Sequence, residues 1–185
     1  MSDQSLVIAT ALLSALFATS LSVASPLDAS ARVELSDSAH SKTAQSSEDA
    51  HPEAKPYDER RDALADVDAA LARAAMRGVD TLIIMGANWC HDSRGLAGHL
   101  QSARFAPMIA ARYELVYVDI GSPQTNEGRN LDIAARFGVE NISGTPNVLI
   151  VTPDGTLRNS AEDAKSWRNA ASRDADDIFA YFAEL

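Results

Sequence analysis

The chain has 185 residues, enough for one domain and an appendage, and 46% of them are hydrophobic. Its formal net charge of −10 argues against binding to nucleic acid, because recognition of phosphates requires clusters of Lys and Arg. A single cysteine excludes an intramolecular disulfide and any zinc site built from cysteine pairs, so the fold depends on its hydrophobic core.

An apolar segment near the N-terminus has the pattern of a secretory signal peptide. Residues 6–24 are apolar or small, and Ser22-Val23-Ala24 offers small residues where a signal peptidase reads. We therefore expect residues 1–24 to be a signal peptide and the mature protein to be periplasmic or secreted. Residues 1–5 contain no Lys or Arg, so the alternative is a retained membrane anchor with the domain facing the periplasm.

The next segment, residues 25–56, is rich in Ser, Ala, Asp and Glu and has almost no large apolar residues. It buries too little surface to offset chain entropy, so we expect a disordered linker. The folded domain is expected at 57–185. Apolar residues at helical spacing predict a first helix over 58–77, which Gly78 ends as a C-cap.

The remaining pattern alternates strands with helices. In chain order it predicts a strand at 81–85, a helix at 94–104, a helical turn at 108–112, a strand at 113–120, a polar loop at 121–128, a helix at 130–137, a strand at 147–151, its returning hairpin partner at 156–158, and a last helix capped by Ser172. Strands separated by helices imply parallel crossovers, and the hairpin adds antiparallel pairing, which together predict an α/β fold.

Cys90 stands where the strand at 81–85 passes into the following helix. The free N–H groups and the positive end of a helix dipole favour a thiolate at that place. About 55 residues later, Thr145-Pro146 opens a second apolar strand. A cysteine on a strand-to-helix turn with a distant Thr-Pro before another strand is the layout of a redox site.

The four segments 86–94, 116–119, 137–139 and 144–155 together resemble the thioredoxin family, most of all bacterial single-domain thioredoxin-like proteins with a Trp-Cys-His-Asp type of site. The resemblance covers residues 57–185. It implies a thioredoxin-like three-layer α/β sandwich with a central mixed sheet.

The resemblance also implies roles for single residues. Cys90 resembles the nucleophilic cysteine, Pro146 the cis-proline that faces it, and Thr145 the residue whose backbone pairs with a bound substrate chain. Two positions depart from the family pattern. Ser93 replaces the resolving cysteine, and Ile84 replaces the buried acid that thioredoxins use for proton transfer.

Each site residue has a second interpretation. Cys90 is either a reactive thiolate or an inert buried residue. Ser93 either donates a hydrogen bond to the thiolate or satisfies the first turn of the helix. His91 either tunes the charge at Cys90 or is an exposed turn residue. Trp89 either shields the thiol and contacts substrate or packs on the domain. The spacing of Cys90, His91, Asp92 and His99 matches no metal-ligand pattern, so neither a metal nor a cofactor is expected.

These expectations favour thiol–disulfide exchange through a single nucleophilic cysteine. The mixed disulfide on Cys90 would be resolved by an external thiol, so the expected partners are protein thiols or disulfides and glutathione. If active, the protein is a monothiol oxidoreductase or isomerase. The alternative function is a non-catalytic module that holds extended peptides against Thr145 and Pro146.

Overall fold

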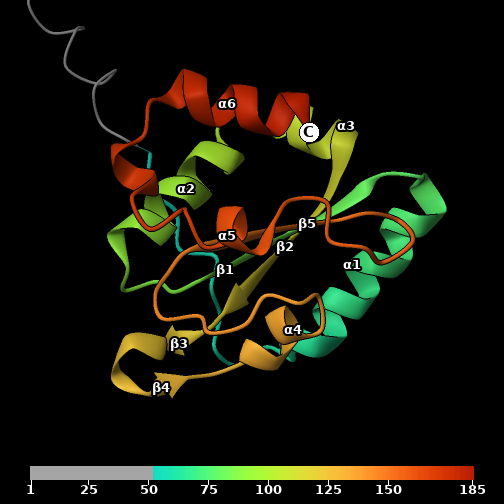
Figure 1. Cartoon of the computed structure of the whole chain (residues 1–185). Helices are drawn as coiled ribbons and strands as arrows, with labels where there is room; N and C mark the ends of the chain where they lie inside the picture. Colours follow the sequence, from blue (N-terminus) through green and yellow to red (C-terminus); the bar gives the residue numbers. More distant parts are fainter. Residues whose placement is uncertain (1–51) are drawn as a thin grey trace, which may run out of the picture. The chain divides into compact units, whose positions relative to one another are not determined.

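The computed structural model describes residues 52–185, so the expected signal peptide and most of the expected linker lie outside the described residues. Helix α1 spans Ala63–Arg77 (Figure 1). The side chain of Asp62 accepts a hydrogen bond from the backbone N–H of Ala65 and thereby caps the helix. This cap explains why α1 begins five residues later than expected. Gly78 ends the helix with φ of 66°, a conformation that glycine adopts without strain.

The central sheet has three strands, β1 at Asp80–Gly86, β2 at Tyr113–Asp119 and β5 at Asn147–Val151, in the order β2-β1-β5. Strand β1 pairs in parallel with β2, and it pairs antiparallel with β5. The expected mixed sheet is therefore confirmed. Strand β1 is buried at all seven positions, as the apolar run predicts for a strand covered on both faces.

The expected hairpin partner at 156–158 does not form a strand. Among the described residues it makes one isolated bridge, between Val151 and Leu157. The reason lies in Asn159, whose side-chain amide accepts from the N–H of Ile150 and donates to the carbonyl oxygen of Val148. A buried side chain thus takes the backbone hydrogen bonds that a longer returning strand would make.

The other elements of the described chain are short. They are α2 at His91–Gln101, α3 at Ala106–Arg112, β3 at Gly121–Ser122, η1 at Pro123–Thr125, β4 at Glu127–Gly128, α4 at Leu131–Ala135, α5 at Ala161–Ala164, η2 at Ala170–Ser172 and α6 at Ala175–Glu184. The last helix begins after Asp174, whose side chain accepts from the N–H of Asp176. Ser172, the expected cap, ends a 3₁₀ turn instead.

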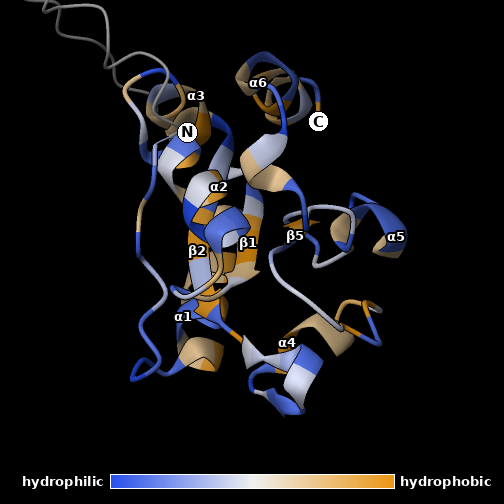
Figure 2. Ribbon diagram, turned by 90° about the vertical axis from the view of Figure 1, so that its left-hand side faces the viewer, coloured by the Kyte–Doolittle hydropathy of each residue, from blue (hydrophilic) through white to orange (hydrophobic). Residues whose placement is uncertain are grey.

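The helices cover both faces of the sheet (Figures 1 and 2). Helices α2, α3 and α6 lie on one face, over a core that includes Leu82 and Ile84 of β1. Helices α1 and α4 lie on the other face, over Ile83 and Met85. Successive residues of β1 therefore enter different cores, as the two-residue repeat of a strand requires. The expected three-layer α/β sandwich is confirmed.

Residues 52–57, called the arm below, pack on α2, although we expected residues up to 56 to be disordered linker. The N–H of Ala54 donates to the carbonyl oxygen of Arg94, at 3.0 Å. Gly98 permits this contact, because a Cβ atom there would lie 2.2 Å from the carbonyl oxygen of Pro52. The boundary is therefore corrected: the folded domain extends at least to Pro52. Within residues 52–185, no helix is both long and apolar enough to cross a membrane.

Candidate active site

Cys90 is the N-cap residue of α2 and follows β1 after a short loop. Its thiol donates to the carbonyl oxygen of Thr145, with 3.6 Å between Sγ and O. The side chain is mostly covered, since Cys90 is 8% exposed. The structure therefore brings together the two segments that the sequence analysis expects to meet, and it places the thiol at the positive end of an 11-residue helix.

The segment that faces Cys90 leads directly into β5. The Thr145–Pro146 peptide bond is cis, the isomer that the sequence analysis predicts. The side-chain amide of Asn147 donates to the carbonyl oxygen of Gly144, at 2.8 Å, and fixes the turn. Thr145 is 6% exposed, and its hydroxyl has no hydrogen-bond partner within the described chain. The backbone carbonyl, rather than the hydroxyl, is thus the group that meets the thiol.

Ser93 occupies the first turn of α2 and is fully buried. Its hydroxyl has no hydrogen-bond partner among residues 52–185, so neither of the two hydrogen-bonding roles considered for it is present in this structure. The hydroxyl lies against the start of the Cys90 loop, because a Cβ atom on Gly86 would be 2.8 Å from Ser93 Oγ. A buried polar side chain without a hydrogen-bond partner is unusual in folded proteins.

Two charged side chains, Arg94 and Glu53, pair beside the loop that carries Cys90. The guanidinium of Arg94 donates to the carbonyl oxygens of Asn88 and Trp89, at 3.2 and 2.9 Å. It also pairs with Glu53 of the arm, at 3.0 Å. This hydrogen bond raises the pKa of Arg94. Arg94 thus holds the loop that carries the thiol and places a positive charge beside it.

His91 points to the arm rather than to the thiol. Its side chain is 64% exposed, and Nδ1 lies 2.7 Å from a carboxylate oxygen of Glu53. The hydrogen bonds from Arg94 and then His91 lower the pKa of Glu53. His91 is therefore an exposed residue whose side chain pairs with Glu53, which also pairs with Arg94. Glu53 and Arg94 were not predicted as site residues, because contacts between polar residues distant in sequence leave no periodic signal.

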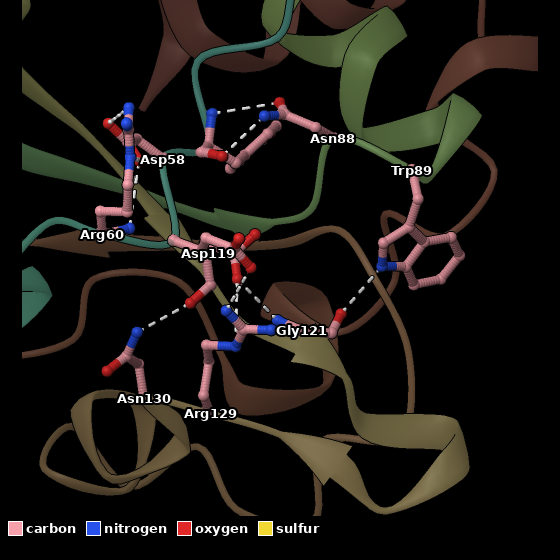
Figure 3. Close-up of polar contacts among 10 residues, drawn as sticks. Asp58, Arg60, Asn88, Trp89, Asp119, Gly121, Arg129 and Asn130 are labelled. Carbon is pink, nitrogen blue, oxygen red and sulfur yellow. Dashed lines mark hydrogen bonds and ion pairs between the residues drawn. The ribbon is translucent and has the colours of Figure 1, made fainter.

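Trp89 forms the rim of the site. It is 53% exposed, and its indole N–H donates to the carbonyl oxygen of Gly121 at 3.1 Å (Figure 3). This contact ties the Cys90 loop to the short hairpin of β3 and β4. The large exposed face of the ring is consistent with the rim role that the sequence analysis considers, rather than with simple packing in the core.

Tyr57, the last residue of the arm, holds both ends of the Cys90 loop. Its backbone N–H and carbonyl oxygen both pair with the side-chain amide of Asn88 (Figure 3), and its hydroxyl donates to the carbonyl oxygen of Ser93 at 3.1 Å. Burial raises the pKa of Tyr57 well above its usual value, with smaller contributions from the charges of Tyr117 and Cys90. The hydroxyl therefore remains a donor throughout the physiological range of pH.

An open pocket of about 830 Å³ adjoins the loop before Cys90. The arm and its continuation to Arg60, the pair Asn88–Trp89, and the β3–β4 hairpin form its wall (Figure 3). Charged side chains of both signs line it, with Arg129 paired to Glu59 at 2.9 Å and to Asp119 at 3.4 Å. The wall is polar, so this side of the site suits a hydrated ligand more than an apolar one. Across residues 52–185, no cluster of His, Cys, Asp and Glu forms a metal site.

Removing the charge of Arg94 and removing the charge of Glu53 are expected to change the reactivity of Cys90 in opposite directions. Arg94→Gln removes a positive charge and is expected to slow the alkylation of Cys90 by iodoacetamide at pH 7 about threefold, whereas Glu53→Gln removes a negative charge and is expected to accelerate it by a similar factor. Alkylation rates by mass spectrometry test this, with Arg60→Gln, from the exposed Arg60–Asp58 pair, as the matched control. If both variants shift the rate in the same direction, the pair has only a structural effect.

Comparisons with known proteins agree with this geometry. Residues 62–153 match the family model described as thioredoxin-like. A crystal structure of a disulphide isomerase from Xylella fastidiosa Temecula1 is similar to this chain, with 34% sequence identity and a TM-score of 0.63. The match covers 71% of this chain and 96% of that protein. A search of curated proteins gives no match.

Proposed function

Because this chain belongs to the thioredoxin family, we propose that it exchanges disulfides through Cys90 alone. The similar proteins support thiol–disulfide exchange as the chemistry. The observation that carries the proposal is the contact between Cys90 Sγ and the Thr145 carbonyl, with Ser93 buried where a second thiol would stand. The similar structure is that of a disulphide isomerase, which favours exchange between substrate disulfides as the reaction.

The reaction needs one thiolate on the enzyme and a second thiol from outside. The thiolate of Cys90 attacks one sulfur of a substrate disulfide, the substrate S–S bond breaks, and the departing sulfur leaves as a thiolate that takes a proton from water. A mixed disulfide now joins Cys90 to the substrate. Since Ser93 has no thiol, an external thiolate must attack this bond and release Cys90. Glutathione, another protein thiol or a second cysteine of the substrate can supply it.

The surroundings of Cys90 support such a role. Cys90 stands at the N-terminus of α2, where backbone N–H groups are free, and Arg94 donates to the carbonyl oxygen of Trp89, the residue before it. The Thr145 carbonyl, which accepts from the thiol in the free protein, becomes available to a backbone N–H of the substrate when the thiol proton is gone. Trp89 and the polar pocket behind it then lie beside the bound chain.

One observation favours a second candidate function. Cys90 is only 8% exposed, and a covered cysteine is often inert. A non-catalytic module would hold an extended peptide against Thr145 and Pro146 without forming a covalent bond. The two candidate functions therefore differ in whether Cys90 forms a covalent adduct with its substrate.

We also place this activity in the cell envelope, in the periplasm or outside the cell. The proposal rests on the apolar segment at 6–24 and on the small residues at 22–24. Thiol–disulfide exchange suits that compartment, where disulfides form and persist. If the N-terminal segment is retained, the protein is anchored in the membrane and faces the periplasm.

The proposed exchange is tested by mixing the reduced protein with oxidised glutathione or with a disulfide-linked peptide. Intact-mass spectrometry is expected to show one adduct per chain, and Cys90→Ser is expected to show none. The matched control Ser93→Ala should form the adduct as the natural chain does, because the hydroxyl of Ser93 makes no hydrogen bond within the described chain. A protein that binds the reduced peptide but forms no adduct is the binding module.

A further inference from the structure

The side chain of Arg168 lies against Gly144, in the segment that faces Cys90. A Cβ atom on Gly144 would be 2.9 Å from Nε of Arg168 and 3.2 Å from its Cζ, so the guanidinium rests on the backbone one residue before Thr145. One of its terminal nitrogens donates to the hydroxyl of Ser143, at 2.8 Å. Arg168 is exposed. Gly144 leaves the space in which this guanidinium lies, and the hydrogen bond to Ser143 holds it against the segment before Thr145.

The charge of Arg168 is not neutralised by the protein. Within residues 52–185, most arginines form an ion pair with a carboxylate: Arg60, Arg61, Arg73, Arg77, Arg94, Arg104, Arg129, Arg136 and Arg158. Arg168 has no such pair there. Arg112 and Arg173 also make no such pair within these residues, but Arg168 differs from them because its guanidinium rests on Gly144, next to the residue whose carbonyl meets Cys90.

Two other charged side chains near this segment make hydrogen bonds to the backbone. The carboxylate of Asp92 accepts from the N–H of Ala171, at 2.9 Å. The ammonium of Lys165 donates to the backbone carbonyl of Glu140, at 3.3 Å. These contacts hold the chain around 165–171 against α2 and against the segment before Thr145. Arg168 is thus positioned by its neighbours while its charge stays available to a ligand.

We propose that Arg168 determines substrate specificity by binding a carboxylate close to the cysteine of the substrate. This inference rests on the proposed function, because it assumes that the substrate backbone lies along Thr145. A substrate cysteine bonded to Cys90 is then near Gly144, and an acidic side chain beside that cysteine meets the guanidinium. Arginine suits this task, since its planar fork binds a carboxylate through two hydrogen bonds. The carboxylate belongs to a polypeptide or to a small thiol such as glutathione.

The test uses peptides whose single cysteine is activated as a disulfide with 2-thiopyridine. Attack by Cys90 on the peptide sulfur breaks that disulfide and releases thiopyridone, whose absorbance gives the rate. The natural chain is expected to react about three- to fivefold faster with a peptide that carries glutamate beside its cysteine than with the matched glutamine peptide. A rate ratio of this size corresponds to the free energy of one exposed ion pair. This preference should decline as salt increases.

The variants separate a specific contact from a general charge effect. Arg168→Gln should remove the preference while leaving the rate with the glutamine peptide unchanged, and Arg168→Lys should retain part of it. Lys165→Gln removes the same charge from the same segment and should keep the preference. Equal rates with both peptides in the natural chain, or equal losses in Arg168→Gln and Lys165→Gln, would overturn the proposal. Oxidised glutathione compared with its ester distinguishes a small carboxylate source from a polypeptide.

A binding measurement separates this inference from the proposed exchange. Cys90→Ser cannot form an adduct, but the difference in its affinity for the reduced glutamate and glutamine peptides reports the contact with Arg168. A tighter complex with the glutamate peptide, lost when Arg168→Gln is added, supports the specificity role even if no covalent exchange occurs. Equal affinity for the two peptides in Cys90→Ser contradicts it.

Discussion

Ser93→Cys is expected to create dithiol reductase activity that the natural chain lacks, with insulin reduction by dithiothreitol accelerated at least about tenfold, because an intramolecular thiol acts at a high effective concentration. Residues 90 and 93 flank the first turn of α2. The hydroxyl of Ser93 has no partner within the described chain, so a thiol there breaks no hydrogen bond. It can attack the mixed disulfide on Cys90 and release the substrate.

The variant should remain slower than a thioredoxin. Ile84 lies in the apolar core under α2, where the family has an acid that accepts protons, and it offers no proton acceptor. Cys90→Ser in the same assay should be inactive, and Ser93→Ala should match the natural chain. If Ser93→Cys folds but stays inactive, the side chain of residue 93 does not reach Cys90. If the natural chain already equals it, resolution by a second thiol does not limit the rate.

The second large effect concerns the arm. Removal of residues 1–51 is expected to leave the stability of the domain nearly unchanged. Removal of residues 1–57 is expected to lower the free energy of unfolding by about 3–5 kcal/mol, the usual cost of deleting a buried aromatic side chain. Tyr57 is 2% exposed and packs edge-on against Tyr117, with 5.5 Å between the ring centroids. Its loss opens a cavity beneath the Cys90 loop.

Urea unfolding of the two truncated proteins measures this difference. Tyr57→Phe in the longer protein keeps the ring and removes only the hydrogen bond to Ser93, so it should lose about 1 kcal/mol. The arm would be dispensable if both truncated proteins unfold at the same urea concentration. A large loss from the removal of residues 1–51 alone would show that the earlier segment also stabilises the domain.

The parts of the fold that follow from local patterns are predictable. The apolar run at 81–85 identifies β1, since a strand buried on both faces carries apolar residues at every position. Gly78 likewise ends α1 as expected. The meeting of Cys90 with Thr145 follows from the order of the motifs, through the resemblance to a known family, and the structure places the two in contact.

The parts that depend on particular long-range polar contacts are not predictable in this way. The arm looks like linker because its composition is polar, and only its hydrogen bonds to Asn88 and Arg94 show that it is folded. Asn159 ends the hairpin through its side chain, which a turn pattern does not reveal. Arg168 is one exposed arginine among many until Gly144 is seen beneath it.

If Cys90 is the single thiol that forms the mixed disulfide, only an external thiol can resolve it. This is measured by the release of a peptide from the purified Cys90 adduct, followed by intact mass as the concentration of glutathione is varied. We expect the adduct to persist without glutathione and its release rate to rise in proportion to the glutathione concentration. Rapid release without any added thiol, or an adduct that glutathione cannot resolve, would show that exchange does not proceed through Cys90 alone.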